Sequence, residues 1–140
     1  MGSGMRDLKV WQEAVALAAD VVRVVRQIAR REIASITDQV AGTALHVATN
    51  LAEGYGRYTV PEQRQLYRAA KRDLLRLETQ LAVLRHADLL SVSAHNDLLK
   101  RVHTVARLLA GYLVYLERQC ATDADEAPLM RPDASAPPAA

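Results

Sequence analysis

The chain has 140 residues, of which 50% are hydrophobic and 4% aromatic, and its formal net charge is +2. This length suits a single domain, and the apolar fraction is sufficient for one sizeable core. No apolar run is long enough to cross a bilayer, no signal-peptide pattern is present, and the lone Cys120 cannot form an internal disulfide. We therefore expect a cytoplasmic protein with no membrane role.

Charge is distributed unevenly along the chain. Residues 1–120 contain 17 Lys and Arg against 12 Asp and Glu, whereas residues 121–140 contain one Arg and four acidic residues. Four of the five prolines also lie in this last segment, which ends in a run of Ala, Ser and Pro. We expect residues 1–4 to be a leader before a native Met5, residues 5–120 to form the folded domain, and residues 121–140 to be a disordered acidic tail.

The first predicted helix spans residues 6–29 and carries two apolar seams side by side, which is a wider apolar face than one bundle groove covers. Such a helix is either central or packed against another subunit. Basic residues gather near its C-terminal end, where cations favour the helix dipole. They are Arg23, Arg26, Arg30 and Arg31.

The second predicted helix spans residues 36–53. Ser35 or Thr37 is expected to cap its start. Gly42 lies among alanines, so a tight helix crossing is expected to offset the cost of a helical glycine. Gly54 and Gly56 predict that the helix ends near Glu53 in a left-handed turn.

The third predicted helix, residues 60–87, carries apolar residues on one face and basic residues on the opposite face. Thr59, Pro61 and Glu62 form a capping box at its start. Leucines recur at spacings of three and four along one side. At about 100° per residue, the basic residues fall on the opposite face. They are Arg64, Arg68, Lys71, Arg72 and Arg76.

Ser91 or Ser93 is expected to cap a last helix over residues 93–119. Four amphipathic helices with short connections predict an all-α, up-down-up-down antiparallel four-helix bundle.

The sequence offers no catalytic site. No Glu is followed by His three residues later, as a di-iron bundle requires, and the four histidines lack the spacing of a zinc site. No nucleophile elbow, phosphate-binding loop or dinucleotide fingerprint occurs. We therefore predict that the protein is not an enzyme and needs no metal or cofactor. Glu53 and Glu78 are interpreted as structural: Glu53 is expected to pair with Arg57 or Arg64, and Glu78 to meet the amides near Thr37.

Four runs of the sequence carry a family resemblance. They are DLKVWQEA (Asp7 to Ala14), TDQV (Thr37 to Val40), NLAEGYGR (Asn50 to Arg57) and LETQL (Leu77 to Leu81). In this order and spacing they resemble the bacterial four-helix bundle family named after the protein encoded in intervening sequences of 23S ribosomal RNA. More distantly they resemble the accessory variability determinants of diversity-generating retroelements. The run from Asn50 to Arg57 is the most specific part of the match. The residues interpreted as its structural motif are Asn50, Glu53, Gly54, Gly56, Arg57 and Glu78.

The resemblance implies a ring-forming homo-oligomer, typically a homopentamer, and partners that include nucleic acid and a reverse transcriptase. The first hypothesis is accordingly a non-enzymatic accessory protein that binds RNA or DNA through the basic face of the helix at residues 60–87, helped by the cluster from Arg23 to Arg31. The alternative is a protein-interaction module that never touches nucleic acid. A metal-binding or ligand-binding bundle is the third and most distant alternative.

Overall fold

The structure is a computed structural model that describes residues 4–28 and 30–130, with side chains described only as far as Ala121. Four long helices follow one another: α1 (Lys9–Ile28), α2 (Ala34–Tyr55), α3 (Val60–His86) and α4 (Val92–Met130). Short 3₁₀ turns, η1 (Gly4–Asp7) and η2 (Arg31–Ile33), precede α1 and α2. The prediction of an all-α four-helix fold is confirmed.

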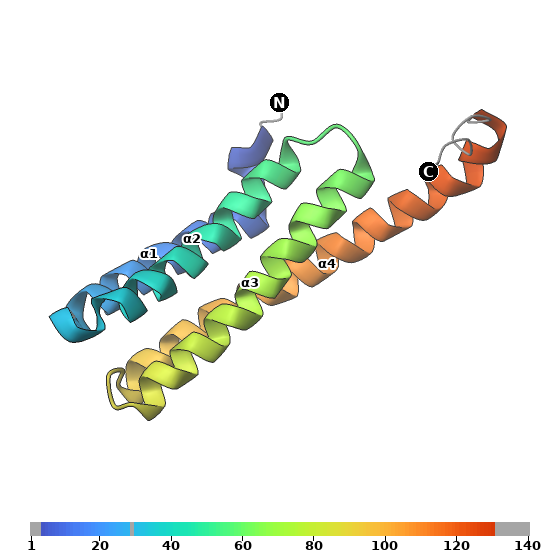
Figure 1. Ribbon diagram of the computed structural model, residues 1–140. Coiled ribbons are helices and arrows are strands. Elements are labelled where there is room, and N and C mark those ends of the chain that lie inside the picture. Colours follow the sequence, from blue (N-terminus) through green and yellow to red (C-terminus); the bar gives the residue numbers. More distant parts are fainter. Residues whose placement is uncertain (1–3, 29, 131–140) are drawn as a thin grey trace.

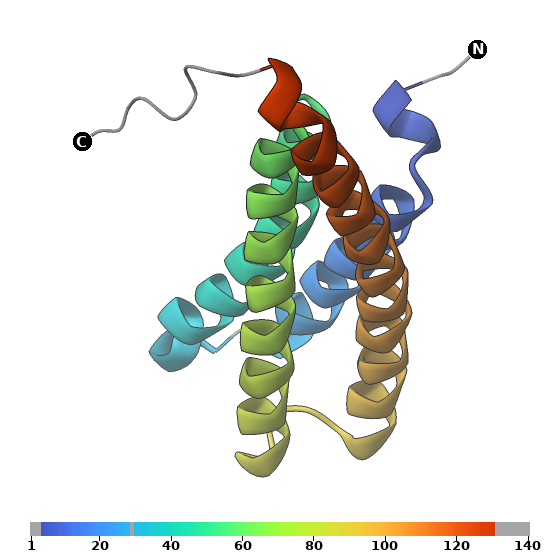
Figure 2. The ribbon, with the colours of Figure 1, turned by 90° about the vertical axis from the view of Figure 1, so that its right-hand side faces the viewer.

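The helices run up, down, up and down, and each packs on its neighbour in the chain while α4 returns to α1 (Figure 1). The α1–α2 turn and the α3–α4 turn lie at one end of the molecule (Figure 1). Figure 2 shows the α1–α2 hairpin behind α3 and α4 and inclined to them. The fold is therefore two antiparallel hairpins packed face to face.

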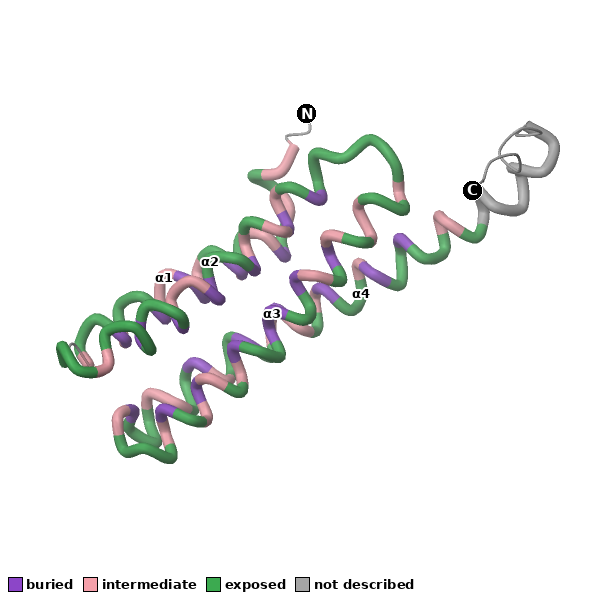
Figure 3. The backbone as a smooth tube through the Cα atoms, viewed as in Figure 1, coloured by how far each residue is buried: buried purple, intermediate pink, exposed green. Residues whose placement is uncertain are grey.

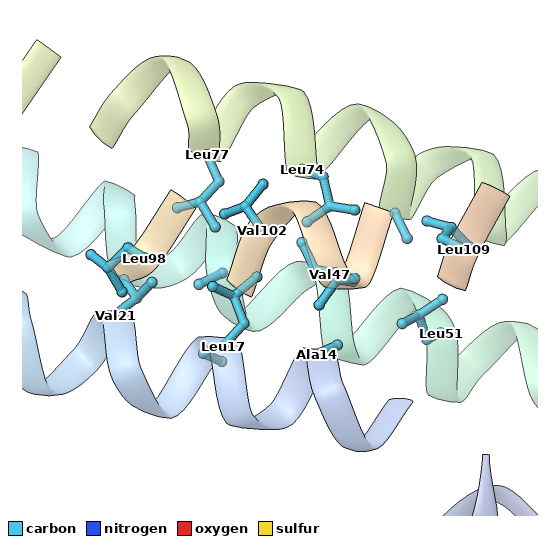
Figure 4. Packing of buried hydrophobic residues seen from close by; sticks show 14 of the residues in the cluster. Ala14, Leu17, Val21, Val47, Leu51, Leu74, Leu77, Leu98, Val102 and Leu109 are labelled. Atoms are coloured by element: carbon cyan, nitrogen blue, oxygen red, sulfur yellow. The ribbon is translucent and has the colours of Figure 1, made fainter. Parts of the chain in front are cut away.

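Buried residues follow one side of every helix and face the interior of the bundle (Figure 3). Leucine and valine fill this core, and Figure 4 shows Leu74 of α3 and Val47 of α2 pointing towards one another. The apolar positions predicted for the core are mostly buried or half-buried, but Val15 and Val22 of α1 and Ile36 of α2 are 40%, 38% and 44% exposed. The prediction also missed Tyr67, which is completely buried one residue after the expected seam position Leu66.

Two of the three predicted helix caps are confirmed. The Thr59 hydroxyl accepts the amide of Glu62 at 3.3 Å, with Pro61 in the first turn, and the Ser91 hydroxyl accepts the amide of Ala94 at 3.0 Å. The cap predicted for α2 is wrong. This helix starts at Ala34, and the Thr37 hydroxyl donates to the Ala34 carbonyl at 3.0 Å instead of accepting a first-turn amide.

The glycines in and after α2 do not have the structural roles that the sequence predicts. α2 continues through Gly54 to Tyr55 and ends at Gly56, whose φ of −82° is right-handed, so the predicted left-handed turn is wrong. Gly54 is buried in the helix against the ring of Tyr67. A Cβ added at Gly54 would lie only 2.3 Å from Cε1 of Tyr67, so no larger residue fits there unless the ring moves. An added Cβ at Gly42 would meet nothing within 4 Å, so Gly42 marks no tight crossing.

The helix boundaries differ most at the two ends of the chain. α1 begins at Lys9, after η1, and α4 continues past the predicted end at Gln119 to Met130. The first part of the segment predicted to be a disordered tail is therefore helical. The rest of that prediction, for residues 131–140, and the leader at residues 1–3 lie outside the described residues.

Candidate nucleic-acid interface

The basic face of α3 consists of Arg64, Arg68, Lys71, Arg72 and Arg76. All but the half-buried Arg64 are exposed to solvent. Arg64, Lys71 and Arg72 form no ion pair within the described residues. These three cations are the part of the face most available to an anionic partner.

Arg68 pairs with a carboxylate across the α3–α4 groove. Its Nη2 lies 2.7 Å from Oε2 of Glu117, and the two side chains are each about half exposed. An ion pair in this setting contributes only about 0.2–1 kcal/mol, because water screens both charges. A phosphate can therefore replace Glu117 at little cost, and Arg68 stays in the candidate interface.

Arg76 has a structural role instead. Its Nη1 lies 3.5 Å from Oδ1 of Asp73, an aspartate that is only 8% exposed. Oδ2 of the same carboxylate accepts the side-chain amide of Asn50 on α2 at 2.8 Å. Because a buried carboxylate is costly without partners, Arg76 and Asn50 both stabilise the α2–α3 packing. Arg76 is the member of the predicted face least free to bind a ligand.

The second basic cluster lies where α1 meets η2, at the end of the bundle near the α3–α4 turn (Figure 1). Arg23 is committed to Asp20, which also accepts Nε of Arg101 from α4 and so ties α1 to α4. Arg26, Arg30 and Arg31 are exposed, and in the part of the chain that the structure describes they form no ion pair. The unpaired cations thus lie in two places, on α3 and where α1 meets η2.

An open hollow of about 500 Å³ adjoins this second cluster, between α1 and α2. Arg26, Arg30 and Arg31 line it together with an apolar floor and the polar residues Thr37 and Asp38. The sequence pointed to the arginines but missed the floor. The signal in the sequence was one of the two apolar seams predicted for α1, to which Val22 and Val25 belong, and Val22 is 38% exposed.

Neither acidic motif residue forms the expected contact within the described residues. Glu53 is exposed and forms no ion pair among the described residues. Glu78 lies 4.0 Å from Nε2 of His103 on α4, so the prediction that it meets the start of α2 is wrong. Leu74, Leu77 and Leu81 place one face of α3 in the centre of the bundle. The neighbouring face, which carries Glu78, lies against α4.

Within residues 4–28 and 30–121, no group of three or more His, Cys, Asp or Glu side chains is placed to share a metal ion. None of the described helices combines the length and the hydropathy that a membrane span requires.

Comparison with known families decides the wider relationship. The model of the 23S rRNA-intervening sequence protein family matches residues 6–111, from the end of η1 into α4. The chain belongs to this family. A search of curated proteins finds no match. Within the matched span, the family-like run from Asn50 to Arg57 ends α2 and supplies part of its packing against α3.

The structure gives most residues of that run a place in the packing. Asn50 donates to Asp73, and Gly54 makes room for the ring of Tyr67. The backbone amide of Gly56 closes the helix by donating to the carbonyl of Glu53 at 3.2 Å, and the Arg57 carbonyl accepts the side-chain amide of Gln63 at 3.0 Å. In this member of the 23S rRNA-intervening sequence protein family, the run therefore fixes the α2–α3 connection.

Proposed function

We propose that the protein is a non-enzymatic, homo-oligomeric accessory protein that binds RNA or DNA electrostatically. The observation that carries the proposal is the group of Arg64, Lys71 and Arg72 on α3, which have no carboxylate partner within the described residues. Membership of a family connected with 23S rRNA supports a nucleic-acid role. The resemblance to retroelement accessory proteins adds a reverse transcriptase as a candidate protein partner.

Binding by such a face follows from counterion release. Each cation that neutralises a phosphate frees a condensed counterion, which favours binding at low salt and depends little on sequence. Arginine adds bidentate hydrogen bonds to phosphate oxygens. Arg64, Arg68, Lys71 and Arg72 together predict that affinity for a duplex falls about 100-fold between 50 and 200 mM salt.

Self-assembly is the second half of the proposal. Val15 and Val22 lie seven residues apart on α1 and are 40% and 38% exposed, and Leu45 on α2 is 51% exposed. A ring built on such apolar residues would repeat the basic face of α3 around its circumference, and several weak sites acting together bind far more tightly than one. Native mass measured with and without nuclease tests this half. We expect a closed oligomer in both samples, and a monomer in either sample would contradict self-assembly.

Charge reversal tests nucleic-acid binding. In the triple variant Arg64→Glu, Lys71→Glu and Arg72→Glu no ion pair is broken, so helicity and melting temperature should stay unchanged while binding of labelled RNA and DNA is lost. The matched control is Arg6→Glu, Lys100→Glu and Arg107→Glu, which changes the net charge equally at exposed positions on η1 and α4. Equal loss of affinity in the two triple variants would contradict a specific role for α3.

The exposed apolar residues of α1 and α2 favour one alternative, a module that docks a protein partner and has no nucleic-acid role. Capture of the same single protein before and after nuclease treatment, with no shift of labelled RNA or DNA, would favour this alternative.

A further inference from the structure

We infer that the hollow between α1 and α2 binds an unpaired nucleotide of a nucleic-acid strand, with the phosphate on Arg26, Arg30 and Arg31 and the base on the apolar floor. This inference rests on the proposed function and deepens it, because it assigns the protein a preference for single-stranded nucleic acid.

The charges around the hollow favour a phosphate. Three guanidinium groups line it, against the single carboxylate of Asp38. Arg26, Arg30 and Arg31 form no ion pair among the described residues, and Asp38 forms none with them. Guanidinium groups bind phosphate oxygens in pairs of parallel hydrogen bonds, so a cluster of three can hold one phosphate from several sides.

The start of α2 adds a second source of positive potential. Ala34, Thr37 and Asp38, all in the first turns of this helix, line the hollow. The residue before the helix is Ile33, which supplies no side-chain cap, and the amide of Ala34 donates to the carbonyl of Arg31 in η2. The positive end of the helix dipole favours an anion in the same place as the arginines.

The floor of the hollow is unlike the surroundings of a plain anion site. Val22, Val25, Ala34 and Ala41 line it, and its exposed lining is mainly apolar. Its volume of about 500 Å³ lies within the range of about 300–1,000 Å³ typical of small-molecule sites. A base can lie against aliphatic side chains and stack on a guanidinium plane, as unpaired bases do in RNA complexes. A paired base cannot enter, because its Watson–Crick edge is bonded to its partner and its faces are stacked on the neighbouring bases.

The substitution Ala41→Leu tests the inference by filling the hollow without changing charge. Its matched control is Ala48→Leu, the same change two turns further along α2 at another half-buried position outside the hollow. Affinities are measured by fluorescence anisotropy for a labelled single-stranded oligonucleotide and for the duplex of the same sequence. Helicity and native mass are recorded for both variants.

We expect the unsubstituted protein to prefer the single strand, Ala41→Leu to lose about tenfold in affinity for the single strand only, and Ala48→Leu to keep the preference. Arg30→Gln with Arg31→Gln should show the same selective loss. Adenosine monophosphate should compete for the site at concentrations at which inorganic phosphate does not.

Equal affinity for the two oligonucleotides, or an unchanged preference in Ala41→Leu, would overturn the inference while leaving binding through α3 intact. Competition by inorganic phosphate as strong as that by the nucleotide would also overturn it, because the site would then bind the anion alone. If the unsubstituted protein binds neither oligonucleotide at low salt, the proposed function itself fails.

Discussion

Two glycines of α2 lie in opposite surroundings. A methyl group at Gly42 would contact nothing within 4 Å, so Gly42→Ala should stabilise the protein by about 0.5–1 kcal/mol through the lower helix propensity of glycine. A methyl group at Gly54 would lie 2.3 Å from Cε1 of Tyr67, and Gly54→Ala should destabilise the protein by about 1–3 kcal/mol through overpacking. Urea denaturation followed by circular dichroism gives both values, and a shift of the same sign in the two variants would refute this account of α2.

Tyr67 should titrate late. Burial is the main cause that raises the pKa of Tyr67 above the ordinary range for tyrosine, and the charge of Tyr112 is the second cause. Burial also raises the pKa of Tyr112. The two rings pack with centroids 5.0 Å apart, and the hydroxyl of Tyr67 is buried without a hydrogen-bond partner among the described residues.

At high pH the folded state keeps these phenols protonated, whereas the unfolded chain ionises them. The free energy of unfolding therefore has its full value below about pH 10 and falls as the pH rises further. A titration followed at 295 nm should show Tyr67 ionising only when the protein unfolds. Ionisation of Tyr67 near pH 10 in the folded protein would contradict the burial.

At the scale of the helices, α3 carries two kinds of arginine on neighbouring turns. Arg72 is exposed and unpaired within the described residues, whereas Arg76 neutralises the buried Asp73 that also binds Asn50 of α2. Arg76→Glu should therefore cost about 1–2 kcal/mol of stability, because it places a negative charge beside a carboxylate that has lost its cation.

Arg72→Glu is the matched control and should change stability by no more than about 0.5 kcal/mol while weakening nucleic-acid binding. Thermal melts and filter binding on both variants separate the roles. The assignment would be wrong if Arg72→Glu unfolded the protein as readily as Arg76→Glu.

At the scale of the whole molecule, periodicity and caps predicted the fold well because they are local. Thr59 and Ser91 cap as expected, since each hydroxyl needs only its own first turn. The start of α2 was mispredicted because the 3₁₀ turn η2 determines where that helix begins, and Thr37 instead bonds back to Ala34. Tyr67 was missed because its place depends on the space left by Gly54, a contact between two helices that no single-helix pattern records.

The candidate site was only partly predictable for the same reason. A helical projection placed the cations of α3 on one face, but it could not show that Arg68 meets Glu117 or that Arg76 meets Asp73. Likewise the cluster from Arg23 to Arg31 was visible in the sequence, whereas the hollow beside it exists only once α1 and α2 are packed together.

The salt dependence of nucleic-acid affinity tests the central claim most directly. Affinity for a duplex is measured from low to high salt for the unsubstituted protein and for the neutral triple variant Arg64→Gln, Lys71→Gln and Arg72→Gln. If these side chains contact phosphates, the slope of log affinity against log salt should become shallower by about 2.7 in the variant. The same slope in both proteins would contradict a phosphate-binding role for α3.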